Sequence, residues 1–123
     1  FSRSGLVEQL EYEGFTTAQA EYGTDAQNAD WNEQAALSAA SYLEYSAFSR
    51  SGLVEQLEYE GFTTAQAEYG TDAQNADWNE QAALSAASYL EYSAFSRSGL
   101  VEQLKYEGFT TAQAEYGATA VGL

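Results

Sequence analysis

A perfect tandem repeat is the feature that most constrains the fold of this chain. Residues 1–47 and 48–94 are identical at every position, and residues 95–123 repeat the first half of the same unit. The third copy differs only by Lys105, where the other copies have glutamate, and by its tail over residues 118–123. Units that recur at a fixed period pack mainly on their neighbours. We therefore predict one continuous array with repeat units at 1–47 and 48–94 and a terminal half-repeat at 95–123.

The stretch at 1–23 has the signals of a helix that ends in a tight turn. Ser2 is a favourable N-cap for a helix over residues 3–13. Phe1, which precedes this cap, is placed to form a hydrophobic staple with the helix. Gly14 stands where helices end in a left-handed residue, and Phe15 follows it at the position that folds back on Leu10.

Two more helices complete the unit. Thr16 and Gln19 form a capping box for a second helix that fades near residues 27–28. Asp30 and Glu33 mark the start of a longer, alanine-rich helix that ends near residues 45–47. No strand pattern is present. The expected fold is an all-α tandem-repeat array of about eight helices, with helix–turn–helix hairpins joined by longer helices in a solenoid-like succession.

The apolar positions of these helices predict the structural core and the interface between repeats. We expect these positions to be Phe1, Leu6, Leu10, Phe15, Tyr22, Trp31, Ala36, Ala40, Leu43, Phe48, Leu53, Leu57, Phe62, Trp78, Leu90, Phe95, Leu100, Leu104 and Phe109.

The charge balance excludes one function of a helix–turn–helix hairpin. The chain has 19 acidic and 4 basic residues, a net charge of −15. The helix that would read DNA, over residues 17–27, contains no lysine or arginine, so nucleic acid is not an expected partner. The acidic surface either keeps the array soluble or steers it toward a basic partner. No apolar run is long enough to predict a membrane span.

No pattern predicts catalysis, a metal or a cofactor. Asp25, Asn28, Asp30, Asn32 and Glu33 resemble the start of a calcium loop, but the glycine and the closing glutamate of such a loop are missing. Helix capping explains Asp30 and Glu33 better. Histidine and cysteine are absent, so the serines have no partner base and the paired glutamates are expected to be solvated. We expect the chain not to be an enzyme.

The order of long helix and hairpin resembles a known family. The segments WNEQA at 31–35, AASYL at 39–43, GLVEQL at 52–57, YEGF at 59–62 and AEY at 67–69 look like the repeat of the Ltp-type host cell surface-exposed lipoproteins. That resemblance implies compact helical modules outside the cell membrane, which exclude superinfecting phages by engaging the phage tape measure protein. The chain differs from the family pattern in having no lipobox cysteine and in having identical copies.

Two functional hypotheses follow. The leading one is a designed or idealised repeat protein without catalytic activity, whose purpose is its architecture, because natural copies normally diverge. The alternative is a superinfection-exclusion module that engages a basic segment of a tape measure protein. A recombinant array would have no natural location, whereas the family lies at the outer face of the membrane. Uncovered ends of the array are expected to favour self-association.

Overall fold

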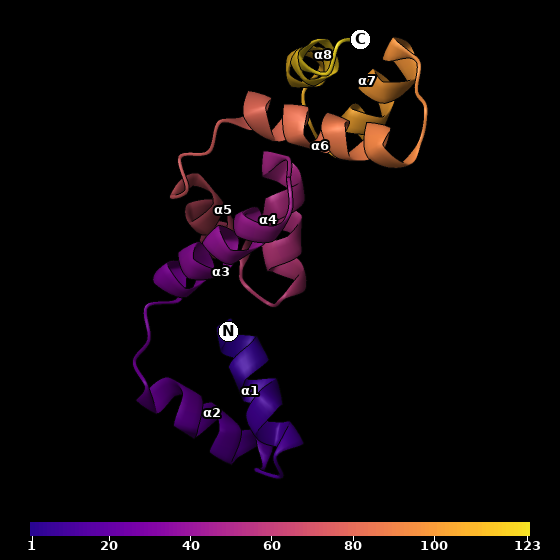
Figure 1. The fold of residues 1–123 in the computed structure, drawn as a ribbon. Coiled ribbons are helices and arrows are strands. Elements are labelled where there is room, and N and C mark those ends of the chain that lie inside the picture. Colours follow the sequence, from indigo (N-terminus) through magenta and orange to yellow (C-terminus); the bar gives the residue numbers. More distant parts are fainter. The chain divides into compact units, whose positions relative to one another are not determined.

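The chain folds into eight α-helices and no strand, which confirms the predicted all-α tandem array (Figure 1). The computed structural model describes residues 1–123. The helices are α1 (Arg3–Tyr12), α2 (Thr17–Ala26), α3 (Trp31–Tyr45), α4 (Arg50–Tyr59), α5 (Thr64–Asp72), α6 (Trp78–Tyr92), α7 (Arg97–Tyr106) and α8 (Thr111–Ala120).

The helices form two compact units. The first contains residues 1–41 and 54–74, and the second contains residues 42–53 and 75–123. Helices α3 and α4 contribute residues to both units. Helices α1 and α2 form a hairpin in the first unit, and α6, α7 and α8 pack together in the second.

Helix capping starts the hairpins as the sequence predicts. The Oγ atom of Ser2 accepts a hydrogen bond from the backbone N–H of Gly5 at 2.9 Å. Thr16 accepts from the backbone N–H of Gln19, whose side chain accepts from the backbone N–H of Thr16 in return. Asp30 caps the long helix through the backbone N–H groups of residues 32 and 33. These bonds satisfy donors that helix starts leave free.

The predicted glycine stop is also confirmed. Gly14 has a φ of 105°, its N–H bonds to the carbonyl of Glu11 at 3.0 Å, and the N–H of Phe15 bonds to the carbonyl of Leu10 at 3.2 Å. This pair of bonds is the Schellman motif. Asn28 is likewise left-handed, with a φ of 51°, just after α2.

The second unit has a core in which a long helix lies across a hairpin. Alanines of α6 and α8 meet leucines of α7, and the buried set is Ala82, Ala86, Leu100, Leu104, Phe109, Ala114 and Ala118. A Cβ atom placed on Gly117 of α8 would lie 2.8 Å from the carbonyl oxygen of Ala82. The glycine therefore lets the two helix backbones meet without an intervening side chain.

The first unit uses the same contact between α3 and α5. A Cβ atom on Gly70 would lie 2.6 Å from the backbone carbonyl carbon of Ala35. The side-chain amide of Gln74 donates to the carbonyl of Ala36 at 2.8 Å. Ala35 and Ala39, four residues apart, are fully buried in α3.

Two of the alanines predicted to face inward from the long helix do not lie at the centre of its buried face. We expected Ala36 and Ala40 to point inward, but Ala40 is exposed and Ala36 is only half-buried. One residue along a helix is a rotation of about 100°. The fully buried alanines are Ala35 and Ala39, so the predicted pair lies at the flank of the contact.

Three aromatic residues predicted in the core are exposed. Tyr22 is 79% exposed because the buried residues of α2 are Ala20 and Thr24, which point to the opposite side of the helix. Phe15 is 50% exposed and Phe1 is 64% exposed. Both belong to the α1–α2 hairpin, which has no long helix before it in residues 1–123.

The equivalent residues of the later copies show what covering these positions requires. Phe62 and Phe109, at the position of Phe15, are 3% exposed. Phe48 and Phe95, at the position of Phe1, each stack edge-to-face on a tyrosine of the preceding long helix at a centroid distance of 5.7 Å.

The remaining predicted core positions fall into two groups. The buried ones are Leu53, Leu57, Phe62, Leu100, Leu104 and Phe109. The half-buried ones are Leu6, Leu10, Trp31, Leu43, Phe48, Trp78, Leu90 and Phe95.

Buried threonines distinguish the first two copies from the last. The hydroxyls of Thr24 and Thr71 are buried without a hydrogen-bond partner, and the third copy has Ala118 at this position.

We expect Thr71→Ala to raise the free energy of unfolding by about 1 kcal/mol, because the cost of an unsatisfied hydroxyl exceeds the loss of one methyl group. Chemical denaturation measures this change. Thr71→Ser, which keeps the hydroxyl and removes the methyl group, should be destabilising, and a stabilising Thr71→Ser would contradict the explanation.

Candidate functional site

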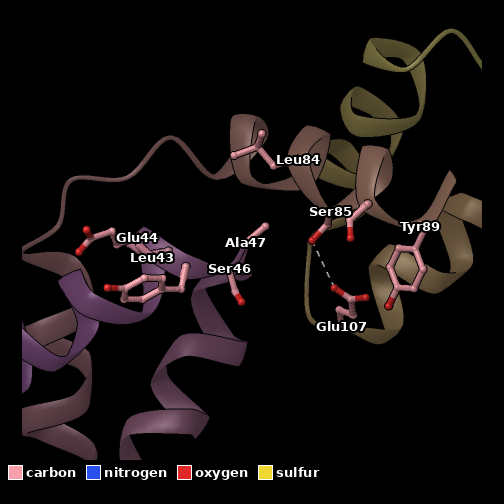
Figure 2. Close-up of a pocket in the computed structure, with 10 residues that line it drawn as sticks. Leu43, Glu44, Ser46, Ala47, Leu84, Ser85, Tyr89 and Glu107 are labelled. Atoms are coloured by element: carbon pink, nitrogen blue, oxygen red, sulfur yellow. Dashed lines mark hydrogen bonds between the residues drawn. The ribbon is translucent and has the colours of Figure 1, made fainter. Parts of the chain in front are cut away.

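An acidic cleft of about 600 Å³ lies in the second unit (Figure 2). We call it the Glu107 cleft. It is lined by residues at the end of α3, in the following loop, on α6 and at the end of α7: Leu43, Glu44, Tyr45, Ser46, Ala47, Leu84, Ser85, Ser88, Tyr89 and Glu107. The lining contains two carboxylates and no basic side chain.

The backbone of Glu107 is fixed from two directions. Its N–H donates to the carbonyl of Gln103 at 3.2 Å, which makes it the C-cap of α7. Its carbonyl accepts from the hydroxyl of Ser49 at 2.6 Å. Ser49 is the serine just before α4, so the start of one hairpin is bound to the turn of the next. The same bond joins Ser2 to the carbonyl of Glu60 in the first unit, also at 2.6 Å.

Tyr89 lies beside Glu107 in the lining of the cleft and is held there by two contacts (Figure 2). Its hydroxyl accepts from the side-chain amide of Gln103 at 3.1 Å, and its ring stacks edge-to-face on Phe95. Tyr45, by contrast, is 80% exposed at the rim. The cleft therefore combines one aromatic ring that is held by its neighbours with one that is exposed at the rim.

Burial raises the pKa of the Glu107 carboxyl above its usual value. The weak hydrogen bond from the Ser85 hydroxyl, at 3.5 Å, lowers this pKa but only partly offsets the burial (Figure 2). Glu107 is half-buried. A carboxylate that has lost part of its water without gaining a cation is stabilised by any cation that enters.

The same position recurs along the repeat. Glu60 occupies it in the first unit, and the Oε2 atom of Glu60 is buried without a hydrogen-bond partner. Glu13 occupies it in the first hairpin, where it is exposed and accepts from the Gln9 amide at 3.4 Å. A carboxylate at this turn is thus a property of the unit, and its burial depends on what lies around the turn.

The chemistry of the cleft suits a cationic side chain. The carboxylates of Glu44 and Glu107 accept hydrogen bonds and attract positive charge. The faces of Tyr45 and Tyr89 offer cation–π contacts, and Leu43 and Leu84 offer apolar surface to an aliphatic stem. No lining residue is a histidine or cysteine.

The residues weighed in the sequence as ligands or catalysts lie elsewhere. Asp25 forms a two-bond ion pair with Arg3, Oδ1 to Nε at 2.8 Å and Oδ2 to Nη2 at 2.9 Å, which holds the pKa of Asp25 below its usual value. Asp30 is a helix cap. No group of three or more acidic side chains is arranged to hold a metal ion. No helix is long and apolar enough to cross a bilayer.

Sequence reasoning did not find the cleft. It counted Glu107 only as part of the net charge, and it did not single out Ser85 or Tyr89. The composition was a partial signal, because an excess of acids predicts a basic partner without locating its site.

The fold and the cleft define a class of protein: an all-α tandem-repeat protein with an acidic groove between helices. Comparison with known protein families identifies the family within this class. The family model described as host cell surface-exposed lipoprotein, Ltp, matches residues 30–73 and again residues 77–121. The chain belongs to this family. Both matches start just before a long helix and contain the hairpin that follows it. Searches among curated proteins and among solved structures found no match.

Proposed function

We propose that the chain is a binding module for a basic protein segment and that the Glu107 cleft receives a lysine or arginine side chain of that segment. The observation that carries this proposal is the half-buried carboxylate of Glu107 in the lining of the cleft, where burial raises its pKa and the Ser85 hydroxyl donates to it at 3.5 Å. The net charge of −15 supports it by steering cationic partners to the chain.

The family membership supports a role in superinfection exclusion. Within that role, the basic segment belongs to a phage tape measure protein, the partner that the resemblance to the Ltp lipoproteins implies. The functional repeat is then a long helix with the hairpin that follows it, because both family matches have this order.

A titration with a 15-residue peptide containing four arginines tests the proposal. We expect Glu107→Gln to weaken binding about tenfold, the effect of losing one hydrogen bond to a charged group. Glu91→Gln is the matched control, since Glu91 is exposed on α6, lies outside the cleft and carries the same charge. Equal weakening by both variants would mean that net charge alone attracts the peptide, and would contradict the proposal.

The pH dependence gives a second measurement on the same pair. Below its raised pKa, Glu107 is protonated and no longer attracts a cation. Peptide affinity should therefore fall as the pH drops through this pKa, and Glu107→Gln should remove that part of the fall. A wild-type profile with the same shape as that of Glu107→Gln would contradict the role of this carboxyl.

An architectural scaffold without catalytic activity is the second candidate function, and the identity of the copies favours it. The changes in the last copy support it as well. Ala118 replaces the threonine whose hydroxyl is unsatisfied, and Thr119 accepts a 3.1 Å hydrogen bond from Arg97 where Arg3 meets Asp25 in the first copy. Failure of a purified tape measure protein to bind the chain at micromolar concentration would favour the scaffold.

A further inference from the structure

The α1–α2 hairpin has an open groove on the side where the equivalent hairpins hold a long helix. We call it the α1–α2 groove. Its volume is about 420 Å³, and it is lined by Leu6, Leu10, Phe15, Gln19, Gly23 and Gln27. None of these residues lines the Glu107 cleft, so this surface is separate from the site of the proposed function.

The later copies show what fills this position. Gly70 and Gly117 are the repeat equivalents of Gly23, and each meets the backbone of a long-helix alanine, Ala35 or Ala82. Gly23 meets no such backbone: a Cβ atom there would find only the Cδ1 atom of Leu10, at 3.7 Å.

The polar group at the edge of the groove is placed to make one further hydrogen bond to a docked helix. Gln74 donates both to the carbonyl of Gly70 in its own helix, at 2.9 Å, and to the carbonyl of Ala36 on the long helix. Its equivalent Gln27 donates to the carbonyl of Gly23 at 3.2 Å. A docked helix would therefore gain the second of these two bonds from a side chain already held in place.

The apolar residues of the groove have the burial expected of an interface without its partner. Leu10 is half-buried and Phe15 is 50% exposed, whereas Leu104 and Phe109 at the same positions are 0% and 3% exposed. The two segments differ in sequence only at Lys105, which replaces Glu11, so the difference in burial comes from the helix that lies on Leu104 and Phe109.

From these contacts we infer that the α1–α2 groove is a docking site for an α-helix of a partner protein that resembles α6, with alanines four residues apart facing Gly23. The occupant is specified by chemistry. It must present a small residue where Ala82 meets Gly117, because the two helix backbones approach so closely there that a larger side chain has no room.

An NMR titration of the whole chain with a helical peptide tests this inference. The peptide has the sequence of residues 77–93 with the substitution Leu84→Lys. A lactam joins the new side chain to that of Glu80 on the exposed side of the peptide and holds the peptide helical. We expect saturable one-to-one binding that shifts the amide signals of Gly23 and Gln27. The matched peptides are Ala82→Leu, which should not bind, and Ala87→Leu, which adds the same bulk at an exposed position and should bind.

A single methyl group in the chain gives the complementary control. Gly23→Ala has room in the free hairpin but places a Cβ atom against the docked helix, so it should weaken the peptide at least tenfold. Ala18→Leu, exposed on α2 outside the groove, should leave the affinity unchanged. Equal binding by the Gly23→Ala chain, or no binding at millimolar peptide, would overturn the inference. Shifts of the same amides that depend on the concentration of the chain alone would assign the groove to a second copy and would also overturn it.

Discussion

Replacing Leu104 by alanine should lower the free energy of unfolding by about 3 kcal/mol, within the range for a fully buried leucine. Leu104 is 0% exposed in the core formed by α6, α7 and α8. The cost has two parts, the loss of buried apolar surface and the cavity that a close-packed core cannot fill.

Leu10 is the matched control because it occupies the same repeat position, and the sequence around it differs only in Glu11, where the third copy has Lys105. It is half-buried beside the open α1–α2 groove, so Leu10→Ala should cost about 1 kcal/mol. Urea denaturation of both variants measures the difference. Equal costs at the two positions would show that the long helix adds nothing to the burial of the hairpin.

Replacing Gly70 by alanine should destabilise the protein by about 2 kcal/mol, whereas the same change at Gly23 should stabilise it by about 0.5 kcal/mol. The added methyl group at position 70 would lie 2.6 Å from a backbone carbon of Ala35, and a backbone cannot turn aside as a flexible side chain can. At position 23 the methyl group has space, and the helix gains from losing a glycine.

The sign of the two changes is what makes this pair informative. Residues 1–47 and 48–94 are identical, so helix propensity and local sequence cancel between Gly23 and Gly70. Gly117→Ala should behave like Gly70→Ala, since its methyl group would lie 2.8 Å from the carbonyl oxygen of Ala82. Thermal unfolding of the three variants gives the comparison, and a stabilising Gly70→Ala would contradict the close approach of α3 and α5.

The elements that sequence could predict are those set by local chemistry. Ser2, Thr16 and Asp30 cap helices through backbone groups at most three residues away, and Gly14 ends a helix through bonds within one turn. Caps of this kind can be recognised without knowing the fold. The all-α class and the number of helices follow from them.

Burial could not be predicted in the same way, because it depends on residues far along the chain. Phe15 and Phe62 have the same neighbours in sequence, yet one is 50% exposed and the other is 3% exposed. The face of the long helix was misjudged for a related reason. In an alanine-rich helix, apolarity scarcely distinguishes Ala35 from Ala36, and the backbone of Gly70 decides which one faces inward.

The cleft escaped prediction because its walls come from distant segments. Glu107 receives hydrogen bonds from Ser49, 58 residues earlier, and from Ser85, 22 residues earlier. The repeat made the carboxylate visible in the sequence three times, at positions 13, 60 and 107. Its burial, and with it the raised pKa of Glu107, depends on the packing around the third copy.

Hydrogen exchange at equivalent amides tests most directly the claim that a long helix completes each hairpin. NMR is the suitable method, since mass spectrometry cannot separate peptides from identical copies. The amides of Leu10 and Gly23 should exchange much faster than those of Leu57 and Gly70, or of Leu104 and Gly117, because α1 and α2 can open without unpacking a long helix. Equal protection in the three copies would contradict this account, and slower exchange in the first copy would reverse it.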